Sequence, residues 1–185
     1  MADAEHAPAK PMVLSPPLDW QVELADALLD GGVTVAAFVP DSRLDGIMAR
    51  LGKRGLPVRG LAREEECIAF AAGHRFAGGR PVVLMQCSGV GNALNALASL
   101  AIPYGLGLPL VLSMRGTLGE GNPAQVPMGR ATPAVLEALG IQAFRLRRPS
   151  DVEVVTRGVL SLALEAQAVA AILLEPELGG GRERG

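Results

Sequence analysis

The stretch PVVLMQCSGVGNALNALASLAIPYGLGLPLVLSM, residues 81–114, contains no Lys, Arg, Asp or Glu. Gly, Asn and Pro break it into pieces that are too short for the about 20 continuous apolar residues of a membrane-spanning helix. Its ends, residues 81–86 and 109–114, are apolar runs typical of strands that are buried on both faces. Residues 91–101 between them have the pattern of a helix without a charged face. The stretch therefore predicts a buried strand, a helix and a second buried strand.

The same alternation of strand and helix runs through the rest of the chain. Further strands are predicted at residues 33–39, 58–62, 143–146 and 170–176. Further helices are predicted at residues 19–29, 41–52, 64–77, 132–139 and 150–166, with Asp41 or Ser42 capping the second. Residues 117–130, with three Gly and two Pro, are expected to form a loop. Six strands separated by helices predict an α/β fold, a doubly wound, mostly parallel six-stranded sheet with helices on both faces.

The length of 185 residues fits a single domain. We expect residues 1–17, which are rich in Ala and Pro, to form a disordered arm, and residues 18–176 to form the folded domain. Residues 177–185, which end in GGGRERG, are expected to be a flexible tail. The arm begins with acids and has no continuous apolar core, so we do not expect it to be a secretory signal.

Charge and cysteine content narrow the possible classes of function. The formal net charge of -2 argues against nucleic acid and anionic membranes as partners, since both demand a basic surface. The two cysteines, Cys67 and Cys87, lie in apolar sequence, which favours a reduced, cytoplasmic setting. A nucleophilic role for either thiol is the alternative to apolar packing. The charge-free helix at 91–101 indicates a partner subunit, because such helices normally meet protein on all sides.

Ligands of doubly wound sheets bind at the carboxyl ends of the strands. The loops expected there are VPDS at 39–42, AREEE at 62–66, QCSGVGN at 86–92 and RGTLGEGNPAQVPMGR at 115–130. The third of these resembles part of a dinucleotide-binding fingerprint, although that fingerprint belongs after the first strand, which here ends in VPDS. Its glycines allow a ligand to approach the backbone closely at the start of a helix. A nucleotide-binding module is therefore one open interpretation.

Three consecutive carboxylates, Glu64, Glu65 and Glu66, precede an alanine-rich helical run. One interpretation is electrostatic, because a carboxylate in the first turn stabilises a helix by about 0.3 to 1 kcal/mol. The other is that one of the three turns inward and works as a buried acid, and helical periodicity does not choose among them. Arg115 and Arg130 flank the longest of the four loops and could clamp an anionic substrate.

Four motifs together resemble the pyrimidine-binding domain of thiamine diphosphate enzymes. They are VPDS, REEE followed by AAG, LMQCSGVGNALNALASL and PAQVPMGRATP. The similarity is greatest to the family of sulfopyruvate decarboxylase alpha subunits, with the phosphonopyruvate decarboxylases close behind. It extends from about residue 19 to about residue 175, so it implies that residues 18–176 form a thiamine diphosphate pyrimidine-binding domain.

The resemblance implies roles for individual residues. Glu64, nine residues before Gly73, matches the family's cofactor-activating glutamate, whose carboxyl hydrogen-bonds the ring nitrogen of the aminopyrimidine. The turn that lies near this ring in the family is matched by Ser88, Gly89, Gly91 and Asn92. Glu64 is therefore the expected catalytic residue, and the turn is expected to complete the cofactor-binding surface.

The resemblance also implies a reaction, the decarboxylation of a small anionic 2-oxo acid. The substrate would be 3-sulfopyruvate, or 3-phosphonopyruvate as the nearest alternative. Loop positions near the reacting carbon are matched by Asp41, Ser42 and Gln125. From their charge, Arg115 and Arg130 are expected to bind the second anionic group of the substrate. A non-catalytic assembly subunit of the same fold is the alternative from another class.

One family feature is missing from the sequence. The family holds magnesium and the diphosphate with a Gly-Asp-Gly segment, and the sequence contains none. The resemblance therefore implies that this chain binds half of the thiamine diphosphate and that a beta subunit holds the diphosphate and Mg²⁺. A second alpha subunit is expected in the complex, and no metal site is expected on this chain.

Overall fold

A computed structural model describes residues 18–179 of the chain, so the expected arm at 1–17 and residues 180–185 lie outside the described residues. Six strands form one sheet in the order β2-β1-β3-β4-β6-β5, and every neighbouring pair is parallel. The strands are β1 (Val35–Phe38), β2 (Val58–Gly60), β3 (Pro81–Gln86), β4 (Pro109–Ser113), β5 (Gln142–Leu146) and β6 (Ala170–Leu174). The predicted α/β fold is confirmed, with a sheet that is parallel throughout.

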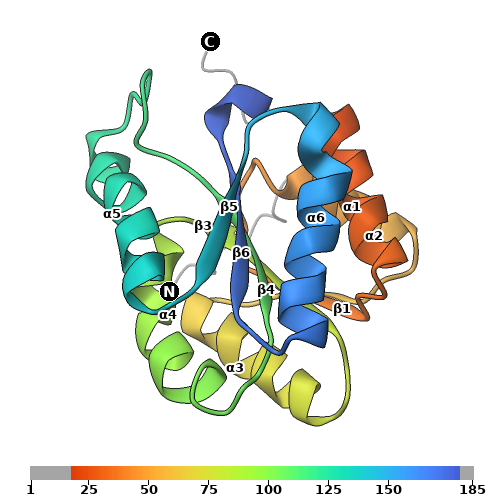
Figure 1. Cartoon of the computed structure of the whole chain (residues 1–185). Helices are drawn as coiled ribbons and strands as arrows, with labels where there is room; N and C mark the ends of the chain where they lie inside the picture. The colour runs from red at the N-terminus through yellow and green to blue at the C-terminus, as the bar shows by residue number, and fades with distance from the viewer. Residues whose placement is uncertain (1–17, 180–185) are drawn as a thin grey trace, which may run out of the picture.

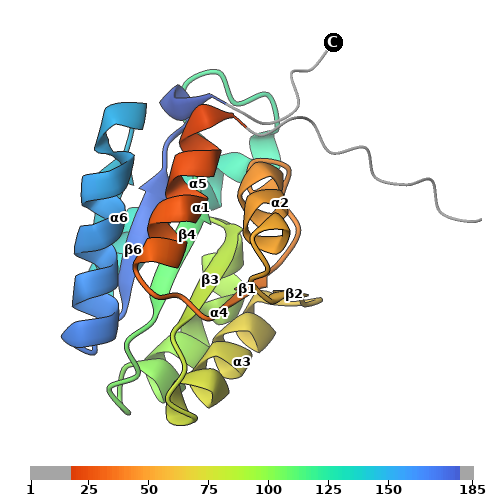
Figure 2. The same ribbon diagram turned by 90° about the vertical axis from the view of Figure 1, so that its right-hand side faces the viewer.

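Helices cover both faces of the sheet (Figure 1). One face carries α1 (Asp19–Asp30), α2 (Asp45–Lys53) and α6 (Val152–Leu160), which lie toward the viewer in Figure 2. The opposite face carries α3 (Glu64–Phe76), α4 (Gly89–Ala96) and α5 (Val126–Ala138). The π-helical turns η1 (Leu97–Ala101) and η4 (Ser161–Glu165) extend α4 and α6.

The central strands contribute to two apolar cores, because their side chains point alternately to the two faces. On β3, Val82 and Leu84 belong to the core beneath α1, α2 and α6, whereas Val83 and Met85 belong to the core beneath α3, α4 and α5. All four side chains are buried. A central strand that is covered on both faces has no position for a charge, which explains the composition of residues 81–86 and 109–113.

The segment after β4 differs from its prediction. Residues 117–130 were expected to be a loop and the next helix was expected to begin at Thr132, but η2 (Pro123–Gln125) and α5 already occupy residues 123–138. The reason is tertiary packing. The buried Thr132 hydroxyl lies within hydrogen-bond distance of the carbonyls of Met128 (2.7 Å) and Cys87 (3.1 Å), which ties α5 to the end of β3.

Two smaller expectations are also corrected. Neither Asp41 nor Ser42 caps α2, whose N-cap is Leu44, because an oxygen of Asp41 instead accepts a hydrogen bond from the backbone N–H of Arg43. The flexible tail was expected from residue 177, but Pro176–Leu178 form a short 3-10 helix. Leu178 is buried in the core beneath α1, so apolar burial extends the fold beyond residue 176.

Within residues 18–179, no helix has both the length and the apolarity that crossing a bilayer requires.

Close packing of α5 on the strand-end loops makes Gly129 sensitive to substitution. A Cβ at this position would lie 2.0 Å from the carbonyl oxygen of Arg115. We expect Gly129→Ala to lower the free energy of unfolding by about 3 kcal/mol, since the clash is with backbone. Urea unfolding with an unchanged m-value measures the loss.

Gly158→Ala is the matched control, because Gly158 also lies inside a helix but a Cβ there would meet nothing within 4 Å. It should raise the free energy of unfolding by about 0.5 to 1 kcal/mol through helix propensity. Equal effects of the two substitutions would contradict the packing described for α5.

Candidate active site

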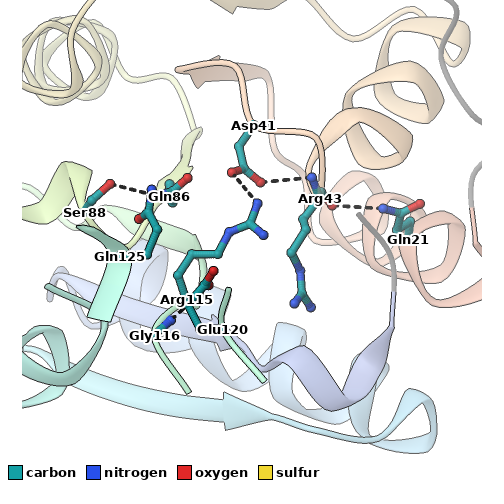
Figure 3. A network of polar contacts seen from close by, with 9 residues as sticks. All are labelled: Gln21, Asp41, Arg43, Gln86, Ser88, Arg115, Gly116, Glu120 and Gln125. Carbon is teal, nitrogen blue, oxygen red and sulfur yellow. Dashed lines mark hydrogen bonds and ion pairs between the residues drawn. The ribbon is translucent and has the colours of Figure 1, made fainter. Parts of the chain in front are cut away.

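The candidate site lies at the carboxyl ends of the parallel strands, the upper edge of the sheet in Figure 1. Loops that follow β1, β2, β3 and β4 meet there. Figure 3 shows Asp41, Gln86, Arg115 and Gln125, which come from elements far apart in the sequence, around one space. The structure therefore brings together most of the residues singled out in the four motifs.

Glu64 is the first residue of α3, and its side chain lies against the beginning of α4. Its Oε2 accepts a hydrogen bond of 2.8 Å from Nδ2 of Asn92. A Cβ on Gly89 would lie 2.3 Å from Cγ of Glu64, so the carboxylate can occupy this position only because residue 89 is glycine. Among the described residues Oε1 of Glu64 accepts no hydrogen bond, which leaves it available to a ligand.

The other two glutamates serve the helix and its entry. Oε2 of Glu66 accepts hydrogen bonds from the backbone N–H groups of Ala62 (3.1 Å) and Arg63 (3.2 Å). Glu65 forms an ion pair with Arg63 at 2.5 Å. A hydrogen bond from its own backbone N–H, helped by Arg63, lowers the pKa of the Glu65 carboxyl. Only Glu64 of the three therefore reaches the turn at the start of α4.

A chain of polar side chains begins at the end of β3. Nε2 of Gln86 donates to Oγ of Ser88 at 2.9 Å and also to Oε1 of Gln125 (Figure 3). This contact joins the turn after β3 to the segment that precedes α5. Sequence reasoning missed Gln86, although it is the one polar residue in the strand PVVLMQ. Gly91 lies close to α5 itself, since a Cβ there would lie 3.3 Å from Cε of Met128.

Asp41 is the centre of a second polar group. Its Oδ2 pairs with the guanidinium of Arg115 at 3.0 Å, and its Oδ1 accepts the backbone N–H of Arg43 at 2.9 Å. The Asp41 side chain is only 5% exposed. The adjacent Ser42 is exposed and takes no part in this group. Sequence reasoning also missed Arg43, whose position directly after VPDS was its only signal.

Arg130 does not join Arg115 as expected. It is exposed on α5 and forms no ion pair within the described chain. The pocket that Arg115 lines, after β4, has Arg43 rather than Arg130 as its second cation. Of the two arginines that flank the long segment, only Arg115 lines this pocket.

The cysteines are placed as apolar core residues. Both are fully buried and free of disulfides. Burial raises the pKa of the Cys67 thiol to about 12, and burial also raises the pKa of the Cys87 thiol. His74 contacts Thr34 and stacks on Phe70 instead of approaching a thiol. In residues 18–179 no group of three or more His, Cys, Asp or Glu could hold a metal ion.

Comparison with known proteins identifies the family. Residues 22–114, which include Asp41, Glu64 and the turn at 86–92, match the family described as "Thiamine pyrophosphate enzyme, N-terminal TPP binding domain". The chain is also 36% identical over 150 residues to sulfopyruvate decarboxylase subunit alpha of Methanothermobacter thermautotrophicus, a match covering 79% of this chain and 89% of that protein. The chain belongs to the sulfopyruvate decarboxylase alpha-subunit family of thiamine pyrophosphate enzymes. The resemblance drawn from the four motifs is thereby confirmed.

One relative is much longer than this chain, so the chain spans only part of its length. Sulfopyruvate decarboxylase of Methanosarcina acetivorans is 39% identical over 110 residues, which are 60% of this chain but only 28% of that protein. Among solved structures, the 2-oxoglutarate:ferredoxin oxidoreductase of Magnetococcus marinus superposes with a TM-score of 0.62. At 14% identity, covering 88% of this chain and 30% of that chain, this likeness shows the fold alone.

The two thiols of this chain, those of Cys67 and Cys87, should be unreactive in the folded state. At pH 8 a thiol with a pKa of about 12 is ionised in about one molecule in ten thousand, against about one in ten at the ordinary value of 9.0. A thiol-reactive dye should therefore modify the folded chain slowly and both cysteines rapidly in urea. Rapid modification of one thiol in the folded chain would instead support a nucleophilic cysteine.

Proposed function

We propose that this chain is the alpha subunit of a thiamine diphosphate-dependent 2-oxo acid decarboxylase and supplies the pyrimidine half of the cofactor site. The observation that carries the proposal is the position of Glu64. Its carboxylate lies against Gly89, is held through Oε2 by Asn92, and has an Oε1 that accepts no hydrogen bond from the described residues. This arrangement occurs in a chain of the thiamine pyrophosphate enzyme family.

The residues present fit an aminopyrimidine ring. A carboxyl oxygen that accepts no other hydrogen bond can share a proton with a ring nitrogen. Gly89 and Gly91 add no side chains to the surface beside it, and Ser88 offers a hydroxyl at the same turn. Bound thiamine diphosphate would supply the electron sink that accepts the electron pair released with carbon dioxide.

The residues of this chain would orient the reactants and move protons. Asn92 binds Oε2 of Glu64, so that Oε1 would be the oxygen left to share a proton with the ring nitrogen. Gln86 fixes Ser88 and Gln125 relative to one another. Gln125, Asp41 and Ser42 would border the reacting carbon, and the nearly buried Asp41 carboxylate is the acid or base within reach of that space.

The proposed substrate is 3-sulfopyruvate, with 3-phosphonopyruvate as the alternative. Both carry a second anion, and arginine binds either through charge-assisted hydrogen bonds. Arg115, next to Asp41, is suited to this anion by its position. Arg130, the other residue expected from charge, would reach the substrate only if the complex brings it there, because it is exposed on α5.

We propose a beta subunit as the holder of the diphosphate and Mg²⁺, since the sequence contains no Gly-Asp-Gly segment. An apolar groove of about 440 Å³ lies between α4 and α5. This uncovered surface next to the site supports the proposal of a partner subunit. Leu94, Ala98, Val135 and Leu139 line it, and α4 also carries Asn92. A second alpha subunit would complete the complex, and two buried free cysteines fit a cytoplasmic location.

Replacing Glu64 tests the proposed catalytic role. In the complex with its beta subunit, Glu64→Gln should lower kcat by about a hundredfold to ten-thousandfold, because glutamine cannot share a proton with the ring nitrogen. Release of carbon dioxide from 3-sulfopyruvate is the measurement.

Glu65→Gln is the matched control, an identical change one residue away that removes only an ion pair with Arg63. It should leave kcat near that of the unmodified complex. If Glu64→Gln turns over as fast as this control, the chain is a non-catalytic assembly subunit.

The division of the cofactor between two chains gives a second prediction. Purified alone, the chain should decarboxylate no 2-oxo acid and bind thiamine diphosphate weakly in the presence of Mg²⁺, because its sequence lacks the Gly-Asp-Gly segment expected to hold the diphosphate. Calorimetric titration and a carbon dioxide assay, each repeated after addition of the beta subunit, measure this. Full activity of the chain without a partner would refute the two-subunit arrangement.

A further inference from the structure

A polar pocket of about 360 Å³ opens beside the ion pair of Asp41 and Arg115. The segment that follows β4 forms one wall, from Met114 to Gly121, and Pro176 after β6 forms another. Its two cationic residues are Arg43 and Arg115. The pocket therefore joins the ends of β1, β4 and β6 at the ligand edge of the sheet.

Arg43 is a buried charge whose hydrogen bonding is incomplete. Arg43 as a whole is only 3% exposed. Its guanidinium donates one hydrogen bond, of 2.8 Å, to the backbone carbonyl of Glu175. Its Nε is buried and has no partner. No described carboxylate forms an ion pair with it, although the charges of Asp41, Glu175 and Glu177 favour its charged form. Its unpaired, buried donors are costly. Packing alone does not explain its presence.

Arg115 adds a second positive charge to the same pocket. Each guanidinium carries five N–H donors, and Arg115 uses one of them, toward Asp41. Burial, and next to it the charge of Arg115, lowers the pKa of Arg43. The two cations therefore repel one another at a place where both retain unused donors, a repulsion that a bound anion would relieve.

The acids around the pocket are engaged elsewhere. Asp41 accepts from Arg115 and from the backbone of Arg43. Glu120, which lines the pocket, accepts from the backbone N–H groups of Gly116 (3.4 Å) and Asn122 (2.9 Å). The buried Glu175 pairs with Arg145. None of these carboxylates occupies the unused donors of Arg43.

We propose that the pocket between Arg43 and Arg115 binds the second anionic group of the substrate, a sulfonate or phosphonate, and that Arg43 is a residue that determines specificity for such substrates. The inference rests on the proposed decarboxylase function. A tetrahedral oxyanion offers three acceptor oxygens for the unused N–H donors of Arg43 and Arg115, which both line the pocket. Arg43 thus takes the role that charge and sequence position had assigned to Arg130.

The position of the pocket fits this role. Figure 3 shows Arg115 reaching toward Asp41 and Arg43 extending away from Asp41 on one side of Arg115, with the group of Gln86, Ser88 and Gln125 on the other side. An anion held by the two arginines would leave the 2-oxo acid end of a three-carbon substrate near Asp41. The pocket volume of about 360 Å³ is of the size found for sites of small ligands.

The direct test uses nuclear magnetic resonance of the full chain, on the Nε–H groups of its arginines. Sulfoacetate and phosphonoacetate are the probes, and acetate is the control for a carboxylate alone. The Nε–H resonance of Arg43, assigned with Arg43→Lys, should shift saturably with both tetrahedral anions and not with acetate. An unchanged resonance, or an equal shift with acetate, would overturn the proposal. This measurement needs neither the partner nor activity.

The kinetic test uses the complex with the beta subunit and compares 3-sulfopyruvate and 3-phosphonopyruvate with pyruvate, which lacks the second anion. Arg43→Gln should lower kcat/KM for the two dianionic substrates by about 10- to 100-fold and leave kcat/KM for pyruvate unchanged. Arg43→Lys keeps the positive charge but loses the planar guanidinium with its paired donors. Its kcat/KM for the two dianionic substrates should lie between the values of the unmodified complex and of Arg43→Gln. Arg157→Gln, an exposed arginine on α6 that pairs only with Glu153, is the matched control and should change none of the values.

The outcomes separate the two proposals. Equal losses for all three substrates with Arg43→Gln would overturn the specificity role and leave Arg43 a structural residue. An unmodified complex that decarboxylates none of the 2-oxo acids would refute the proposed function, and the resonance of Arg43 would then decide the anion pocket by itself. If Arg43→Gln does not fold, Arg43→Lys and the titration of the unmodified chain still decide it.

Discussion

A sheet whose strands are all parallel brings every strand's carboxyl end to the same edge, and burial on both faces keeps that edge rigid. In this chain the loops after β1, β2, β3 and β4 must therefore meet, although their motifs are up to 91 residues apart, from residue 39 to residue 130. The polar residues that the apolar strands exclude accumulate there. Glu64 can lie against α4, and Asp41 can pair with Arg115, because the backbone that carries them is held by two cores.

The site divides into two regions with different electrostatics. Around Glu64 the structure supplies a single carboxylate, an amide from Asn92 and glycine backbone, on the side where α4 and α5 leave an apolar groove. Around Asp41 it supplies alternating positive and negative side chains in a polar pocket. We propose the first region for the aminopyrimidine ring of the cofactor and the second for the anionic group of the substrate. Gln86 and its two hydrogen bonds connect them.

Much of the fold was predictable because period and composition are local properties. Strands buried on both faces must be apolar runs, and glycines must lie where helices end or where chain segments touch. The beginning of α5 was not predictable in this way. Pro and Gly at 119–129 indicate a loop by local rules, but Thr132 binds the end of β3 and Gly129 packs on the carbonyl of Arg115. The capping of α2 was mispredicted because Oδ1 of Asp41 accepts the backbone N–H of Arg43 and Oδ2 pairs with the distant Arg115.

By itself, the sequence determined the α/β class, the strand and helix alternation, the ligand edge and the family, because these depend on residue type, period and order along the chain. It also singled out Glu64 through the spacing to Gly73, a match to a family pattern. Only the tertiary structure showed that Glu64 has a different partner from Glu65 and Glu66. Only the tertiary structure showed that Arg43, and not Arg130, lines one pocket with Arg115. Which side chains share a space depends on the packing of α3, α4 and α5 against the sheet, and no local pattern encodes those contacts.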